Sequence, residues 1–229
     1  MGYLISDKKQ KPSSINLVLS TLRFFYSRVL ERDLFKKISS VKSEKKIPVV
    51  LSKDEIKRIL EAAENKKHKI LIELMYSSGL RVSEAVSIKV EDLDLIQKMA
   101  KVQSGKGKKD RIVILSSNLA SHIDSRLKKM AKKGISSAFL FPSQKNTASH
   151  ISIRQAQKAI KLIAKKAGIE KRVFCHAFRS SFATHLLEDG VDIRYIQALL
   201  GHSSIATTQV YTKVSTEQLK KIRSPLDKL

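Results

Sequence analysis

Apolar residues recur every three to four positions along most of this chain, and one central stretch breaks that period. The helical spacing occurs over residues 15–29, 56–63, 119–130 and 153–167. Residues 99–103 and 111–115 instead alternate or are β-branched, and they flank a basic turn that contains glycine. The first pattern indicates amphipathic helices and the second indicates strands. We therefore predict a mainly α fold with one small antiparallel sheet, in the α+β class.

A stretch rich in serine and lysine separates the first predicted helix from the rest of the chain. It covers residues 38–46 and is followed by Pro48. The residue before a proline is pushed out of the helical region, so the stretch has the character of a linker. We place a domain boundary here, between an N-terminal helical segment over 1–46 and a second domain over 47–229.

The sequence also marks where several helices begin. Ser52 and Glu55 have the spacing of a capping box, in which two side chains satisfy free backbone N–H groups reciprocally. Asp192 is expected to cap a later helix. In the N-terminal segment, Ser13 or Ser14 is expected to cap the first helix.

The chain carries a large excess of positive charge. Its 45 Lys and Arg against 21 Asp and Glu give a net charge of +24 over 229 residues. A folded chain with this balance requires a polyanionic partner, and both segments are basic. We expect no membrane span, because no apolar run approaches about 18 residues. The single cysteine, Cys175, excludes an internal disulfide, and we expect a reducing, cytoplasmic setting.

The metal-binding side chains do not form a recognisable pattern, and we expect neither a metal nor a cofactor. The six histidines include no His-x-x-x-His pair, and one cysteine cannot build a zinc module. Chemistry on a phosphate then depends on arginine, which can hold two phosphate oxygens at once. Arg81 lies between the end of one predicted helix and the start of another. Arg179 follows His176 by three residues, which places both on one helical face.

Residues 190–211 have the pattern of two helices joined by a turn, which is also typical of a helix-turn-helix motif. In that motif the second helix enters the major groove of DNA. Here that helix offers small, apolar and threonine side chains, and only Gln209 could hold a base through two hydrogen bonds. A non-enzymatic DNA-binding protein therefore remains an alternative.

Three motifs, in this order, resemble tyrosine recombinases of the phage-integrase family, and the archaeal Xer type in particular. They are Ser78-Gly-Leu-Arg-Val-Ser-Glu84, His176-Ala-Phe-Arg-Ser-Ser-Phe-Ala-Thr-His-Leu-Leu187 and Leu200-Gly-His-Ser-Ser-Ile-Ala-Thr-Thr-Gln-Val-Tyr-Thr212. The resemblance implies a catalytic domain over 47–229, preceded by a partial core-binding domain over 1–46. It also implies an active site made of Arg81, Lys106, His176, Arg179, His202 and Tyr211.

The resemblance implies DNA cleavage and rejoining without metal or ATP. Tyr211 would be the nucleophile and would form a 3′-phosphotyrosyl intermediate, while the two arginines hold the non-bridging oxygens. Lys106 would protonate the leaving 5′ oxygen. His176 would accept the proton of the tyrosine, and His202 would donate to the phosphate.

Double-stranded DNA is the expected partner. Lys108, Lys109 and Arg111 belong to the basic turn and the strand after it, and we expect them to contact DNA. The resemblance implies a homotetramer on two DNA sites, with the C-terminal tail of each protomer docking on a neighbour. The biological role is left open between chromosome dimer resolution and mobile-element integration. A type IB-like topoisomerase, which relaxes supercoils with similar residues, is a further alternative.

Overall fold

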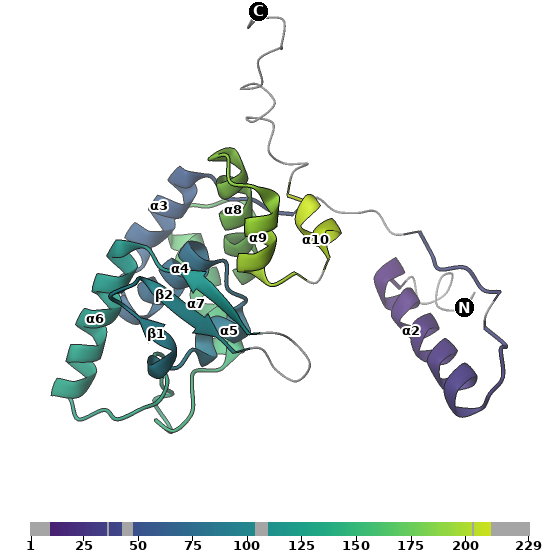
Figure 1. Ribbon diagram of the computed structural model, residues 1–229, viewed down its shortest axis with the longest axis horizontal. Coiled ribbons are helices and arrows are strands. Elements are labelled where there is room, and N and C mark those ends of the chain that lie inside the picture. Colours follow the sequence, from purple (N-terminus) through teal and green to yellow (C-terminus); the bar gives the residue numbers. More distant parts are fainter. Residues whose placement is uncertain (1–9, 36, 43–47, 104–109, 203, 212–229) are drawn as a thin grey trace, which may run out of the picture. The chain divides into compact units, whose positions relative to one another are not determined.

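The computed structural model describes residues 10–35, 37–42, 48–103, 110–202 and 204–211 of the chain. The chain divides into two compact units, Met1–Lys46 and Ile47–Leu229, and each is described by itself (Figure 1). None of the helices in the described ranges is both long enough and apolar enough to cross a membrane.

The described part of the first unit is built on helix α2 (Pro12–Phe24). The helix continues into a π-helical turn over Phe25–Val29. Ile15 and Leu19 are buried, as their spacing predicts. Val29 is 59% exposed, however, so the buried stripe is shorter than the sequence pattern indicates.

The predicted cap of this first helix is wrong. Neither Ser13 nor Ser14 is the N-cap residue, because both already lie inside α2. The N-cap is Lys11, whose side chain makes no capping hydrogen bond, and Pro12 follows it in the first turn. Proline suits that position because its missing N–H would have no partner within the helix, and its fixed φ favours helix initiation.

The second unit is mainly helical, as predicted. Its helices are α3 (Lys53–Ala62), α4 (Lys66–Ser78), α5 (Val82–Ser87), α6 (Ser117–Lys132), α7 (Ile153–Lys166), α8 (Cys175–Glu188), α9 (Ile193–Leu200) and α10 (Ile205–Gln209). The predicted capping box opens α3, where Ser52 Oγ accepts from Glu55 N at 3.1 Å and Glu55 Oε2 accepts from Ser52 N at 2.7 Å. The Asp192 side chain caps α9, also as predicted, by accepting from Arg194 N at 2.7 Å.

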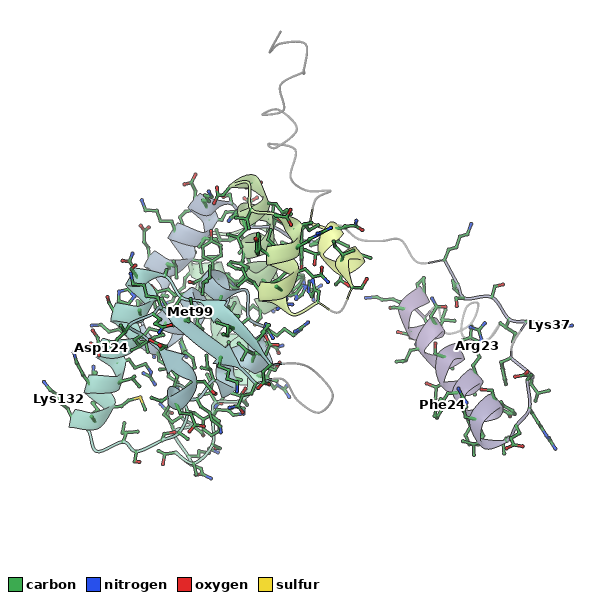
Figure 2. All side chains as sticks on the ribbon, viewed as in Figure 1. Arg23, Phe24, Lys37, Met99, Asp124 and Lys132 are labelled. Atoms are coloured by element: carbon green, nitrogen blue, oxygen red, sulfur yellow. The ribbon has the colours of Figure 1, made fainter. Side chains whose placement is uncertain are left out.

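The predicted small antiparallel sheet is confirmed. It consists of β1 (Leu93–Asp94), β2 (Met99–Val102) and β3 (Arg111–Ile114), paired in the order β1-β2-β3. Val102 lies opposite Arg111 in the register, so the two ends of the basic turn meet at one end of the sheet. One face of the sheet carries the buried residues Ala100, Val102 and Val113. The other face carries exposed Met99, Ile112 and Ile114, and Met99 is labelled in Figure 2.

Two hydrophobic clusters hold the second unit together. The larger cluster contains residues from each of the helices α3, α4, α5, α6 and α7, from the first turn of α8 and from the buried face of the sheet. The smaller cluster contains Phe182, Ala183, Leu187, Ile196, Leu200 and Tyr211. It lies where α8, α9 and α10 gather (Figure 1), so the end of the described chain is packed on its own small core.

Candidate active site

Arg81 stands at the junction of α4 and α5. Helix α4 ends at Gly79, whose φ of 62° is left-handed, and Arg81 is the N-cap residue of α5. Its backbone N–H donates to Glu84 Oε2 at 2.8 Å and its NH1 donates to Glu84 Oε1 at 3.0 Å. The two residues, three positions apart in sequence, therefore form an ion pair. The Arg81 side chain keeps 37% of its surface exposed, which leaves it accessible to an anion.

Arg179 lies at the centre of the site and is fully buried. Its NH1 donates to Gly79 O at 2.7 Å, and its NH2 donates to Leu200 O at 2.7 Å and contacts His202 Nε2 at 2.9 Å. Its Nε has no hydrogen-bond partner among the described residues. Burial, followed by repulsion from Arg81, lowers the pKa of Arg179 to about 10. This guanidinium thus ties three chain segments together and still has a donor free.

The hydrogen bonds around His202 identify its tautomer. Arginine only donates, so Nε2 of His202 accepts from Arg179 NH2 and carries no hydrogen. The hydrogen is therefore on Nδ1, which donates to Thr208 Oγ1 at 2.9 Å. Burial, together with Arg179 and Arg81, lowers the pKa of His202 to about 4. The imidazole is consequently neutral at physiological pH in this arrangement.

Tyr211 packs beside His202. Their rings are nearly parallel, with an interplanar angle of 19° and centroids 6.4 Å apart. The Tyr211 N–H donates to Thr208 O at 3.0 Å, and only 4% of the residue is exposed. Tyr211 also favours the charged form of Arg179, so its phenol lies within electrostatic range of that guanidinium.

His176 occupies the first turn of α8, one turn before Arg179, and is exposed to solvent. Partial desolvation, followed by the positive charges of Arg179 and Arg81, lowers its pKa. His176 also contributes to the lowered pKa of His202. The structure therefore brings Arg81, His176, Arg179, His202 and Tyr211 into one neighbourhood, whereas Lys106 lies outside the described residues.

The expected DNA contacts of the basic turn have different outcomes. Lys108 and Lys109 lie outside the described residues. Arg111 is described, and its side chain is only 8% exposed. It donates to Glu84 Oε1 at 3.0 Å, to Glu84 Oε2 at 2.7 Å and to Leu199 O at 2.9 Å. Because Nε, NH1 and NH2 of Arg111 each already donate to a protein acceptor, this guanidinium differs from that of Arg179, and its placement gives no support to the expected contact with DNA.

The lowered pKa of Glu84 shows that the positive charges around it stabilise negatively charged groups in the site. Burial alone would raise its pKa, but hydrogen bonds from Arg111 and from the Arg81 backbone outweigh burial and lower the pKa to about 2. Arg81 and Arg111 pair with this carboxylate, and Arg179 lies within electrostatic range of it. Three guanidiniums therefore face one carboxylate, which leaves an excess of two positive charges. A phosphate entering here would find an excess of charge already in place.

Other chemistry has little support in the part of the chain that the structure describes. That part contains no group of three or more His, Cys, Asp or Glu able to hold a metal ion. Cys175 is buried, and burial raises the pKa of its thiol to about 11, so it is a poor nucleophile. His185 is also buried, with Nδ1 2.8 Å from the Tyr76 hydroxyl, so it packs against α4.

Two features of the site had no clear signal in the sequence. In the sequence, Thr208 is only one of the threonines of the helix-turn-helix pattern, yet in the structure it is buried and hydrogen-bonded to His202. Helix α10, which would have been the recognition helix, is only five residues long. The charge of Arg111 groups it with the basic turn, and only the tertiary structure shows its contact with Glu84.

Comparison with known proteins gives one consistent answer. The model of the phage integrase family matches residues 49–218. The tyrosine recombinase XerA of Pyrococcus horikoshii is 38% identical over 207 residues, which cover 90% of this chain and 71% of that protein. A crystal structure of XerA recombinase superposes with a TM-score of 0.70 at 32% identity, covering 96% of this chain and 78% of the other. The XerH recombinase in a post-cleavage complex with DNA has a TM-score of 0.80 at 23% identity over 95% and 68% of the two chains, which supports the fold. The chain therefore belongs to the phage integrase family and is a tyrosine recombinase, an enzyme that breaks and rejoins DNA.

Proposed function

We propose that Tyr211 is the nucleophile of this recombinase and that Arg81, Lys106, His176, Arg179 and His202 assist it. The observation that carries the proposal is the position of Arg179, which is buried, bonded to Gly79 O and to His202, and within electrostatic range of Tyr211. In the reaction, the Tyr211 oxygen forms a bond to a DNA phosphorus and the 5′ oxygen leaves. The 3′-phosphotyrosyl link conserves the phosphodiester energy, so rejoining needs no ATP.

The arginines hold the non-bridging oxygens of the phosphate. Arg81 is partly exposed, and Arg179 Nε has no hydrogen-bond partner among the described residues. Because these donors are fixed before DNA arrives, little reorganisation is needed as charge builds on the phosphate. We expect Arg179→Lys, which keeps the charge but loses the fork, to reduce cleavage by about 10²-fold or more.

The two histidines begin in the neutral form and have different tasks. Neutral His176 can accept the phenolic proton of Tyr211 at physiological pH. His202 has no hydrogen on Nε2 and must gain a proton there before it can donate to the phosphate. A bound phosphate supplies the negative charge that raises the pKa of His202, so DNA binding itself prepares this donor. Lys106 protonates the leaving 5′ oxygen.

The proposed substrate is a pair of double-stranded DNA sites held by four protomers. The basic first unit contributes as a partial core-binding domain, and the C-terminal tail docks on a neighbouring protomer. We propose chromosome dimer resolution in the cytoplasm as the biological role, supported by the similarity to XerA. Mobile-element integration and type IB-like relaxation of supercoils are the competing roles.

A nicked suicide substrate tests the chemistry. The nick lets the cleaved segment diffuse away, so the covalent intermediate accumulates and is visible on a denaturing gel. We expect an adduct with the wild-type protein and none with Tyr211→Phe, while both proteins bind DNA with similar affinity. An adduct that persists in Tyr211→Phe would disprove the assignment of the nucleophile.

Two further assays distinguish the competing roles. Site-specific exchange between two marked duplexes, without comparable relaxation of plasmids that lack the site, supports a recombinase over a topoisomerase. Conversion of a head-to-tail plasmid dimer into monomers, without the reverse insertion reaction, supports dimer resolution over integration. Efficient relaxation without exchange would overturn the proposed role.

A further inference from the structure

Arg111 is the first residue of β3 and directly follows the basic turn that carries Lys106. Its side chain leaves the sheet and reaches two elements distant in sequence. It pairs with Glu84 on α5, and its Nε donates to the carbonyl of Leu199 near the end of α9. Arg111 therefore joins the strand after the Lys106 turn to the segments that carry Arg81 and His202.

Glu84 transmits this contact to Arg81. Its Oε1 accepts from NH1 of both Arg81 and Arg111, each at 3.0 Å. Its Oε2 accepts from the Arg81 backbone at 2.8 Å and from Arg111 NH2 at 2.7 Å. The Glu84 and Arg111 side chains are 15% and 8% exposed, so solvent screens this pair only weakly.

Arg111 also packs against the turn that leads to His202. Gly201 has a φ of 63°, and a Cβ placed there would lie 2.8 Å from Arg111 Cδ and 3.3 Å from its Nε. The last two carbonyls of α9 each accept from an arginine, Leu199 O from Arg111 and Leu200 O from Arg179. The position of His202 thus depends on two arginines that arrive from different elements.

We propose that Arg111 is a positioning residue for DNA cleavage, which orients Arg81 through Glu84 and holds the His202 turn, and that it does not bind DNA. The inference rests on the proposed roles of Arg81 and His202. Without Arg111, Glu84 would pair with Arg81 alone and would neutralise the guanidinium that is meant to hold the phosphate. Lysine cannot replace Arg111, because one ammonium cannot span both carboxylate oxygens and the Leu199 carbonyl.

The test compares cleavage and binding in Arg111→Lys and Arg111→Gln. We expect both variants to form the suicide-substrate adduct at least about tenfold more slowly in single turnover, since a buried charge-assisted pair is lost. We expect the affinity for DNA to stay within about twofold, and the slope of log K against log salt concentration to stay unchanged, because no phosphate contact is lost. A phosphate-binding arginine would instead reduce that slope by about 0.9. A reduced slope, or cleavage at the wild-type rate, would overturn the proposal.

Two further variants separate positioning from general loss of structure. Gly201→Ala pushes against Arg111 without removing any charge, so it too should slow cleavage and leave the salt slope unchanged. Glu84→Gln combined with Arg111→Lys should cost less than the sum of the single effects, because both act through one pair. Strict additivity of the two would contradict a role of Arg111 through Glu84.

Lys132→Gln serves as the matched control for the loss of one positive charge. Figure 2 shows Lys132 at the end of α6, away from α9 and α10. It should alter neither cleavage nor the salt slope. The proposed active site is checked separately by the wild-type protein and Tyr211→Phe. If the wild type forms an adduct that Tyr211→Phe lacks, any failure of the Arg111 variants concerns Arg111 alone.

Discussion

Gly79 is required for two reasons: its backbone is left-handed, and there is no room for a side chain. The cost of replacing it can be measured. Its φ of 62° is unfavourable for residues that carry a Cβ, and a Cβ here would lie 2.5 Å from Phe182 Cδ1 and 2.8 Å from Leu200 Cδ2. We expect Gly79→Ala to lower the free energy of unfolding by about 2 to 5 kcal/mol, as the sum of backbone strain and overpacking. Chemical denaturation measures the change.

Gly134 provides the matched control for this prediction. Its φ of 65° is almost the same, but no atom of the described residues lies within 4 Å of a Cβ placed on it. Gly134→Ala should therefore cost only the backbone term, about 1 kcal/mol. Equal losses of unfolding free energy at the two positions would show that Phe182 and Leu200 move aside for the added methyl group without an energetic penalty.

Thr208 is the residue that orients His202. We expect Thr208→Val, which keeps the shape but removes the acceptor of the Nδ1 hydrogen, to slow adduct formation about tenfold. Thr208→Ser keeps the hydroxyl and should remain close to the wild-type rate. The suicide-substrate assay measures both variants at constant salt. Similar rates for valine and serine would mean that the hydrogen bond has no part in the reaction.

At the scale of one helix, α8 contains two adjacent buried serines that differ in the hydrogen bonds of their hydroxyl groups. Ser180 is buried and its hydroxyl has no partner among the described residues. Ser181 is also buried, but its hydroxyl donates to Ala177 O and accepts from Leu51 N, both at 2.8 Å. We expect Ser180→Ala to leave stability unchanged or raise it, and Ser181→Ala to lower it by about 1 to 3 kcal/mol. Thermal denaturation would contradict this if Ser180→Ala were the more destabilising change.

The element scale also shows which local signals in the sequence are sufficient. The capping box at Ser52 and the cap at Asp192 were predicted correctly, because each involves residues within one helical turn. The predicted cap of α2 is wrong, because serine is a common cap residue and the prediction rested on Ser13 or Ser14. The helix instead begins at Pro12, without a side-chain cap. The exposed Val29 was missed because burial depends on what covers a face, and the sequence period does not contain that information.

At the scale of the whole molecule, the histidines predict how stability depends on pH. His68, His176, His185 and His202 all have a pKa below the ordinary 6.5, with burial as the largest cause and His202 reaching about 4. The unfolded chain therefore binds more protons as pH falls below about 6.5, so the free energy of unfolding falls with it. Glu84, with a pKa of about 2 against an ordinary 4.5, adds a second loss as pH falls below 4.5.

The expected result is a melting temperature that declines from pH 6.5 towards pH 4 at constant ionic strength. His202→Asn should make this decline less steep, because the residue that titrates lowest among these histidines is removed. A melting temperature that rises on acidification would show that these imidazoles are protonated in the folded protein.

The sequence by itself determined the helices, the small sheet and the order of the motifs. These depend on periodicity, local caps and residue identity, which are properties of neighbouring positions. The same motifs, through their resemblance to a known family, selected the residues that the structure gathers around Arg179.

Only the tertiary structure decided what the charged residues do. The sequence alone groups Arg111 with the basic residues beside it, whereas the structure shows its side chain donating to Glu84 and to the end of α9. The tautomer of His202 likewise follows from Arg179 and Thr208, which approach it from two different helices. A side chain's partners depend on distances between remote segments, and the packing of the helices sets those distances.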